Sequence, residues 1–139
     1  LFYKAKRFYL KVKKYLSTVN KYYLVDHSLK YAILGTKNED LGRTLENIVF
    51  IELLRRGYEV YIGKLYQKEI DFVAIKRSEQ MYIQVSTYLD DEKTLLREVT
   101  PLLAIKDAYP KIVIARTHQE DYSCNGVIVK DIANWLLDK

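Results

Sequence analysis

The sequence has little of what disulfide-stabilised, disordered or membrane-spanning proteins contain. Its 139 residues include 1 cysteine, 2 prolines and 5 glycines. The single cysteine, Cys124, excludes an intramolecular disulfide framework and favours a reducing compartment. A hydrophobic content of 49% argues against disorder, and the few prolines and glycines exclude collagen-like or linker sequence. No apolar run approaches the roughly 20 residues that span a bilayer, and no signal-peptide pattern is present, so we expect a soluble, cytoplasmic chain without a membrane partner.

The residues that are present suffice for one domain, but their charge is unevenly distributed. A domain usually takes about 100–200 residues, so the length fits one domain with a small appendage. The chain does not begin with Met, and we expect a piece of a longer protein. Residues 1–30 hold eight lysines and arginines against one aspartate, whereas the rest holds 15 basic and 17 acidic residues. This asymmetry fits a nucleic-acid partner or, equally, a solvated surface next to a missing domain.

The basic front segment also contains aromatic residues. Five of the 13 tyrosines lie within residues 3–23, between the cations. Lysines interleaved with tyrosines suit phosphate contact and base stacking, but tyrosines are also common at the interface between two domains. On the first interpretation we expect DNA contacts from Lys4, Lys6, Arg7, Lys11, Lys13 and Lys14.

Hydrophobic periodicity predicts an α/β domain behind a basic helical segment. In the front segment we predict a helix over 2–16, a strand over 21–26 and a short helix ending at residue 34. The further predicted elements are a helix over 41–56, strands over 59–66, 69–76 and 81–87, a helix over 90–109, strands over 111–116 and 126–130, and a helix over 131–138. From residue 41 the order is therefore α-β-β-β-α-β, then β-α. We expect a central mixed sheet of four or five strands flanked by helices, with residues 1–35 as the basic segment and 36–139 as the main domain.

Three polar side chains lie in otherwise apolar surroundings. Glu46 borders an apolar helix stripe, which is costly unless the carboxylate is paired, bound to a metal or able to reach water. Asp71 lies inside a strand, where aspartate is disfavoured, and alternation places it on one face while Ile70 and Phe72 lie on the other. Gln84 lies in the next strand and can neighbour Asp71 across the pair. The alternatives are a salt-bridged glutamate at the helix boundary and a polar sheet edge.

These three residues lie in segments that resemble the PD-(D/E)xK, or restriction-endonuclease-like, superfamily. The segments are the helical GRTLEN at 42–47 and the strands EIDFV at 69–73 and IQVS at 83–86. More narrowly, residues 15–139 resemble the uncharacterised C-terminal domain of bacterial and archaeal P-loop AAA-type ATPases. The resemblance implies a restriction-endonuclease-like core. On the same resemblance, the basic segment before this core is interpreted as a remnant of a winged-helix element. It also implies an ATPase domain elsewhere in the full protein, since this chain has no G-x-x-x-x-G-K-[ST] loop and so no ATP site of that kind.

The superfamily's chemistry is metal-assisted hydrolysis of phosphodiester bonds. Two carboxylates and a backbone carbonyl hold Mg²⁺, which activates water and neutralises charge on the phosphate. By position, the resemblance assigns Asp71 as the strand acid, Glu46 as the helix acid, Gln84 as the second strand ligand and Val85 as the carbonyl donor. Ser86 stands where the family has its catalytic lysine.

The serine at this position puts catalysis in doubt. A hydroxyl cannot supply a positive charge, and losing one preorganised electrostatic contact costs on the order of 10²–10³ in rate. Lys64, Lys68 or Lys76 would have to replace the lysine from a neighbouring strand.

Three functions stay open on these grounds. The favoured one is a degenerate nuclease-like domain that binds DNA or mediates assembly for an AAA-type ATPase, either as a single copy or as a homo-oligomer. The second is an active Mg²⁺-dependent endonuclease that uses Glu46, Asp71 and Gln84. The third is a pure protein-interaction module, because a shared fold does not establish activity.

Overall fold

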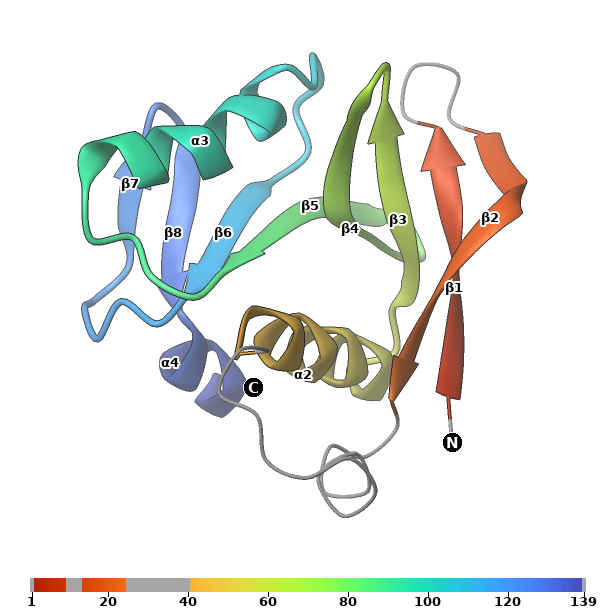
Figure 1. Cartoon of the computed structure of the whole chain (residues 1–139), viewed down its shortest axis with the longest axis horizontal. Coiled ribbons are helices and arrows are strands. Elements are labelled where there is room, and N and C mark those ends of the chain that lie inside the picture. The colour runs from red at the N-terminus through yellow and green to blue at the C-terminus, as the bar shows by residue number, and fades with distance from the viewer. Residues whose placement is uncertain (1, 10–13, 25–40, 139) are drawn as a thin grey trace.

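A mixed sheet of eight strands, with helices on both faces, organises the chain (Figure 1). The computed structural model describes residues 2–9, 14–24 and 41–138. The elements in chain order are β1 (Phe2–Tyr9), β2 (Lys14–Leu24), α2 (Leu41–Arg55), β3 (Glu59–Leu65), β4 (Lys68–Lys76), β5 (Glu79–Ser86), α3 (Glu92–Leu103), β6 (Lys111–Ala115), β7 (Tyr122–Cys124), β8 (Val127–Asp131) and α4 (Ile132–Leu137). The strands lie in the order β2-β1-β3-β4-β5-β6-β8-β7. In the described part of the chain, no helix is long and apolar enough to cross a membrane.

The basic front segment forms strands, so the prediction of a helix over 2–16 is wrong. β1 pairs antiparallel with β2 and parallel with β3, which joins the segment to the same sheet as the rest of the chain. The segment is rich in Tyr, Phe and Val, which favour strands once a sheet edge offers backbone partners. The strand predicted over 21–26 is the second half of β2. The predicted helix ending at residue 34 and the boundary near residues 35–40 lie outside the described residues.

From residue 41 the predicted element order is confirmed, apart from the short strand β7, which the prediction lacks. α2, β3, β4, β5, α3 and β6 follow one another, with β8 and α4 after them. The helix predicted over 90–109 is shorter, because α3 begins after its N-cap Asp91 and ends at Leu103. Asp91 accepts the Thr94 N–H at 2.7 Å, and Pro101 lies inside the last turn. The prediction of four or five strands is too low, because β1 and β2 extend the sheet at one edge and the short β7 extends it at the other.

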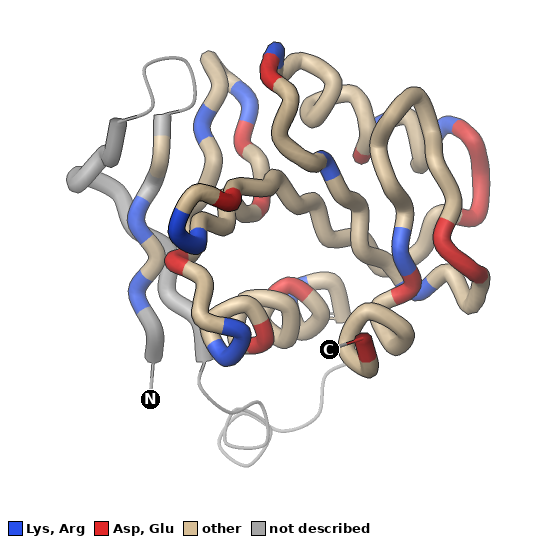
Figure 2. Tube along the Cα trace, turned by 180° about the vertical axis from the view of Figure 1, so that it is seen from behind, with Lys and Arg blue, Asp and Glu red and all other residues tan. Residues whose placement is uncertain are grey.

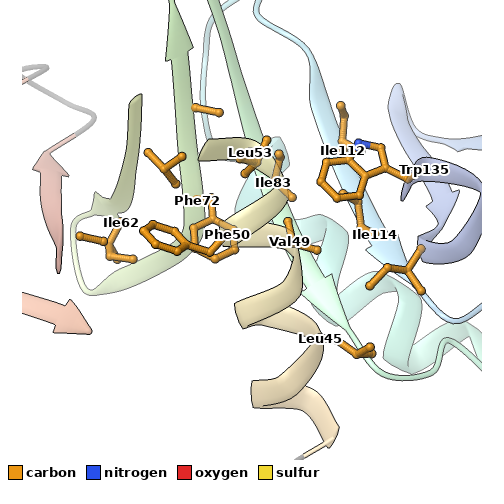
Figure 3. Packing of buried hydrophobic residues seen from close by; sticks show 14 residues of the cluster. Leu45, Val49, Phe50, Leu53, Ile62, Phe72, Ile83, Ile112, Ile114 and Trp135 are labelled. Atoms are coloured by element: carbon orange, nitrogen blue, oxygen red, sulfur yellow. The ribbon is translucent and has the colours of Figure 1, made fainter. Parts of the chain in front are cut away.

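The two faces of the sheet are covered by different helices (Figure 1). α2 and α4 pack on one face, where their apolar side chains meet those of the strands (Figure 3). We call this group the α2-side cluster; it includes Leu45, Val49, Phe50, Leu53, Ile62, Phe72, Ile83, Ile112, Ile114 and Trp135. α3 packs on the other face in the α3-side cluster, formed by Phe8, Leu65, Ile70, Val73, Tyr82, Val99, Leu102, Ile105, Val113, Val127 and Val129. Each fully buried Leu, Ile or Phe contributes about 1.5–3 kcal/mol, so these clusters supply most of the driving force for folding.

Candidate functional site

A β-bulge in β4 lies at Asp71. One residue of β3, Ile62, faces two residues of β4, Asp71 and Phe72. A bulge of this kind bends the strand and changes the direction of its side chains. As a result Ile70 belongs to the α3-side cluster and Phe72 to the α2-side cluster. The predicted grouping of these two residues on one face is wrong, because it assumed an uninterrupted period of two.

Gly63 permits the close approach of β3 and β4 next to this bulge. It pairs with Ile70, and a Cβ atom on Gly63 would lie 2.8 Å from the Ile70 Cβ and 3.1 Å from the Val73 Cγ2. Real Cβ contacts are longer than this, so only glycine fits at the present separation of the strands. The bulge that carries Asp71 therefore depends on a glycine in the neighbouring strand.

Asp71 and Gln84 meet where β4 and β5 separate. The backbone pairing of β4 with β5 ends at Phe72 and Ile83, and side chains continue the connection beyond that pair. The Asp71 N–H donates to Gln84 Oε1 at 2.8 Å, and the Val85 N–H donates to Asp71 Oδ2, also at 2.8 Å. Both side chains thus accept hydrogen bonds from backbone N–H groups that the pairing of β4 with β5 does not use. The structure brings together two of the residues that the sequence singled out.

The hydrogen bond from Asp71 determines which edge of the Gln84 amide is available. Gln84 is only 6% exposed, and it lies on the α3 side because Ile83 and Val85 pack on the α2 side. Its Oε1 faces the Asp71 N–H, so the Nε2 group points elsewhere. Within the described residues Nε2 makes no hydrogen bond, which leaves a buried donor available for an acceptor such as a phosphate oxygen. Gln84 could act as a metal ligand only through the second lone pair of an oxygen that already accepts a hydrogen bond.

The other predicted site residues lie on the other face of the sheet or already have partners. Glu46 is half-buried on α2, which packs against β5 on the face opposite to the one where Gln84 lies. Ser86, at the end of β5, donates its hydroxyl to the Tyr88 carbonyl at 3.2 Å. Lys76 cannot replace the missing lysine, because it lies at the far end of β4 and its Nζ donates to the Arg56 carbonyl at 2.9 Å.

The predicted metal ligands are an oxygen-rich set with little negative charge. Within the described residues, no three His, Cys, Asp or Glu side chains are grouped so that they could hold a metal ion. The predicted set contains two acids, Glu46 and Asp71, together with a neutral amide and a carbonyl. Mg²⁺ accepts such oxygen ligands, but two charges attract it less than three would. The binding of Mg²⁺ by Glu46, Asp71, Gln84 and Val85 stays a prediction.

Part of the predicted basic DNA-contacting surface lies on β1. Lys4 and Lys6 are exposed on either side of the buried Ala5, so both side chains extend from the same face of the strand. Arg7 and Lys14 belong to β1 and β2, but their side chains lie outside the described part, as do Lys11 and Lys13 altogether.

Sequence reasoning missed a charged cluster at the C-terminal end of α2. Glu52 is buried and accepts hydrogen bonds from Arg55 Nε at 2.7 Å and from Arg56 Nε at 3.2 Å. The hydrogen bonds from Arg55 hold the pKa of Glu52 below its ordinary value, although burial acts in the opposite direction. The signal in the sequence was the spacing of a glutamate three and four residues before two arginines, followed by the helix-ending Gly57.

Comparison with known proteins gives relatives but no function. No known protein family and no solved structure matches the chain. An uncharacterized protein of Haemophilus influenzae is 45% identical over 137 residues, which are 99% of this chain and 34% of that protein. An uncharacterized protein of Methanocaldococcus jannaschii is 34% identical over 76 residues, which are 52% of this chain and 17% of that protein. The chain therefore spans about a third, or less, of the length of these relatives.

Proposed function

We propose that this chain is a nuclease-like, DNA-binding module of a larger P-loop ATPase, built on a restriction-endonuclease-like core with a degenerate metal site. The observation that carries the proposal is the contact between Asp71 and Gln84 at the point where β4 and β5 separate. These are the two positions that the resemblance assigns to strand ligands. The element order α2-β3-β4-β5-α3-β6 and the mixed sheet are consistent with such a core.

The chemistry of the site supports weak catalysis or none. The Gln84 oxygen accepts a hydrogen bond from the Asp71 N–H, and Ser86 supplies a hydroxyl where a cation is needed. Lys76 holds the end of α2 instead of the site. With one carboxylate and one ammonium fewer than the family's pattern, both metal affinity and stabilisation of the transition state are reduced.

Exposed cations support DNA binding, and the length of the relatives supports a place in a larger protein. Lys4 and Lys6 extend from one strand face and are positioned to contact phosphates. The relative from Haemophilus influenzae is matched over only 34% of its length, which leaves room in that protein for a domain of another kind. An ATPase domain in the full protein rests on the resemblance.

DNA binding is tested by measuring affinity for duplex DNA at several salt concentrations. We expect a clearly negative slope of log affinity against log salt. Replacing Lys4 and Lys6 by alanine should reduce the slope by about 2, since each phosphate contact contributes about 0.9. Arg97→Ala removes an exposed cation from α3 and serves as the control. A slope near zero for the unaltered chain would contradict DNA binding.

The degenerate site is tested by restoring the family's residues. The unaltered chain should cleave plasmid DNA in Mg²⁺ or Mn²⁺ no faster than Asp71→Ala. The double variant Gln84→Glu with Ser86→Lys should cleave at least about tenfold faster, since each change restores an electrostatic contact. Adding Asp71→Asn to the double variant should remove this gain. Efficient cleavage by the unaltered chain would show an active nuclease, and an inactive double variant would count against the proposed site.

A further inference from the structure

Two adjoining cavities lie at the end of the sheet where α2 ends and β4 turns into β5. One has a volume of about 620 Å³ and is lined by Arg55, Arg56, Tyr58, Lys76 and Asp138. Figure 2 shows basic residues at the end of α2 and at the β4–β5 turn. The other cavity has a volume of about 290 Å³, and its lining includes Met81, Tyr109 and Ile112 as well as Tyr58, with Glu79 and its neighbours at the β4–β5 turn on one side. Tyr58 is thus shared by a cationic cavity and a largely apolar one.

The cationic cavity is held in place by contacts with the backbone. The Arg56 guanidinium lies over the Trp135 ring at 4.4 Å, and its Nη2 donates to the carbonyls of Trp135 at 2.5 Å and Asp138 at 2.6 Å. Lys76 donates to the Arg56 carbonyl and lies 5.4 Å from the centre of the Tyr58 ring. These contacts fix Arg56 and Lys76 in the absence of a ligand, so an anion bound here would order few further side chains.

The same cations keep donors that the protein does not use. The hydrogen bonds of Arg55 go to Glu52 through Nε and Nη2, and those of Arg56 leave from Nε and Nη2. Within the described residues, the Nη1 groups of both arginines make no hydrogen bond. Lys76 has three N–H donors and uses one of them. In the cationic cavity these three cations stand against the carboxylates of Glu52 and Asp138, so this cavity carries a net positive charge, while the Glu79 carboxylate lines the adjoining one.

An aromatic wall next to free cationic donors fits one class of ligand. We propose that the two cavities bind a nucleotide unit, with its phosphate against Arg55, Arg56 and Lys76 and its base along Tyr58 in the apolar cavity. Charge-assisted bonds from guanidinium and ammonium groups suit phosphate oxygens. A base that stacks on an aromatic side chain gains about 1–3 kcal/mol without a strong sequence preference. The unit is supplied by a free nucleotide or by the phosphorylated end of a DNA strand.

This nucleotide site is separate from the Asp71 site. Lys76 lies five residues beyond Asp71 in β4, and at about 3.3 Å per residue the two positions are roughly 17 Å apart. Nucleotide binding should therefore persist in Asp71→Ala. If Asp71→Ala abolishes it while the fold is retained, the assignment to these cavities is wrong.

The experiment measures binding by calorimetry with adenosine monophosphate, adenosine and inorganic phosphate as separate probes. Adenosine monophosphate should bind at least about tenfold more tightly than either fragment, because only the whole nucleotide uses both cavities. Single-stranded DNA with and without a 5′-phosphate distinguishes the two sources. A preference for the phosphorylated strand indicates a strand end, and equal binding of the two strands beside tight monophosphate binding indicates a free nucleotide. Affinity for the monophosphate no greater than for inorganic phosphate would overturn the proposal.

Variants connect the binding to the named residues. Arg55→Ala and Tyr58→Leu should each weaken monophosphate binding by about tenfold, the first by removing a charged donor and the second by removing the stacking surface. Arg97→Ala is the matched control, because the Arg97 side chain is 73% exposed and that of Arg55 is 64% exposed. Circular dichroism shows whether each variant keeps the fold. Unchanged binding by folded Arg55→Ala would mean that the cations serve only Glu52 and the end of α2.

Discussion

Replacing Asp131 should cost the fold about 2–3 kcal/mol of unfolding free energy. Asp131 is 4% exposed and ties the loop after β6 to the start of α4. Its Oδ1 accepts the N–H groups of Thr117 at 3.0 Å and His118 at 2.8 Å, and its Oδ2 accepts those of Ala133 at 3.1 Å and Asn134 at 3.3 Å. In Asp131→Ala the lost helix cap costs about 1 kcal/mol. The N–H groups of Thr117 and His118 also lose their acceptor, which costs about 1–2 kcal/mol more, because water can replace the carboxylate only at the exposed His118.

The contribution of Asp131 depends on its negative charge. Burial raises the pKa of the carboxyl group, but the four backbone donors outweigh it and hold the pKa below its ordinary value. A carboxylate with a lowered pKa in the folded state contributes its full stability above the unfolded value of about 4, and loses it as the pH falls through the folded value. The difference between the unaltered chain and Asp131→Ala should therefore be largest at neutral pH and shrink below about pH 4.

Urea unfolding followed by circular dichroism at pH 7 and pH 3 measures this difference. Asp131→Asn keeps one carbonyl oxygen and should lose about half as much stability as the alanine variant. Asp121→Ala is the control, because Asp121 is exposed and, among the residues that the structure describes, pairs only with Lys130, at 2.9 Å. It should change stability by less than about 0.5 kcal/mol. A loss below about 1 kcal/mol in Asp131→Ala, or an equal loss at both pH values, would refute the reasoning.

Two further substitutions test the packing of the sheet. Gly63→Ala should destabilise the chain by about 1–3 kcal/mol, because the new Cβ would lie 2.8 Å from the Ile70 Cβ. Gly42→Ala is the control and should cost little, because the nearest atom to its new Cβ would be 3.4 Å away. Equal stability of the two alanine variants in urea would contradict the tight approach at the bulge. Tyr82→Phe should cost about 1 kcal/mol, because the buried Tyr82 hydroxyl donates to Asp107 at 2.5 Å. Burial raises the pKa of Tyr82, so its contribution should be complete below pH 10 and decline above, and a pH-independent difference in melting temperature would count against this assignment.

Local sequence patterns were sufficient for the elements from residue 41 onward, except for the short strand β7. α2 could be predicted because Leu45, Val49 and Leu53 recur every four residues and Gly57 follows its last turn. The hairpin of β4 and β5 could be predicted from two apolar runs separated by a short polar turn. The contact between Asp71 and Gln84 followed from pairing these two strands.

The basic front segment could not be predicted from local patterns. Its apolar residues fit a helical period, and its strand-favouring Tyr, Phe and Val residues do not by themselves decide against a helix. β1 becomes a strand because β3 offers it a parallel edge, from Arg7 beside Ile62 to Tyr9 beside Lys64, more than 50 residues away in the sequence. Pairing at such a distance depends on the folded core, since strand propensity is decided by context more than by the residues themselves.

Composition and periodicity alone determined the α/β class, the order of elements after residue 41 and the strand neighbours Asp71 and Gln84. Tertiary structure decided the strand identity of the front segment, the bulge that separates Ile70 from Phe72, and the meeting of Arg55, Arg56 and Lys76 around Tyr58. The physical reason is that periodicity records only which face of a single element is buried. Partner edges, bulges and side-chain clusters arise from contacts between elements far apart in the chain, and they form only when the sheet is assembled.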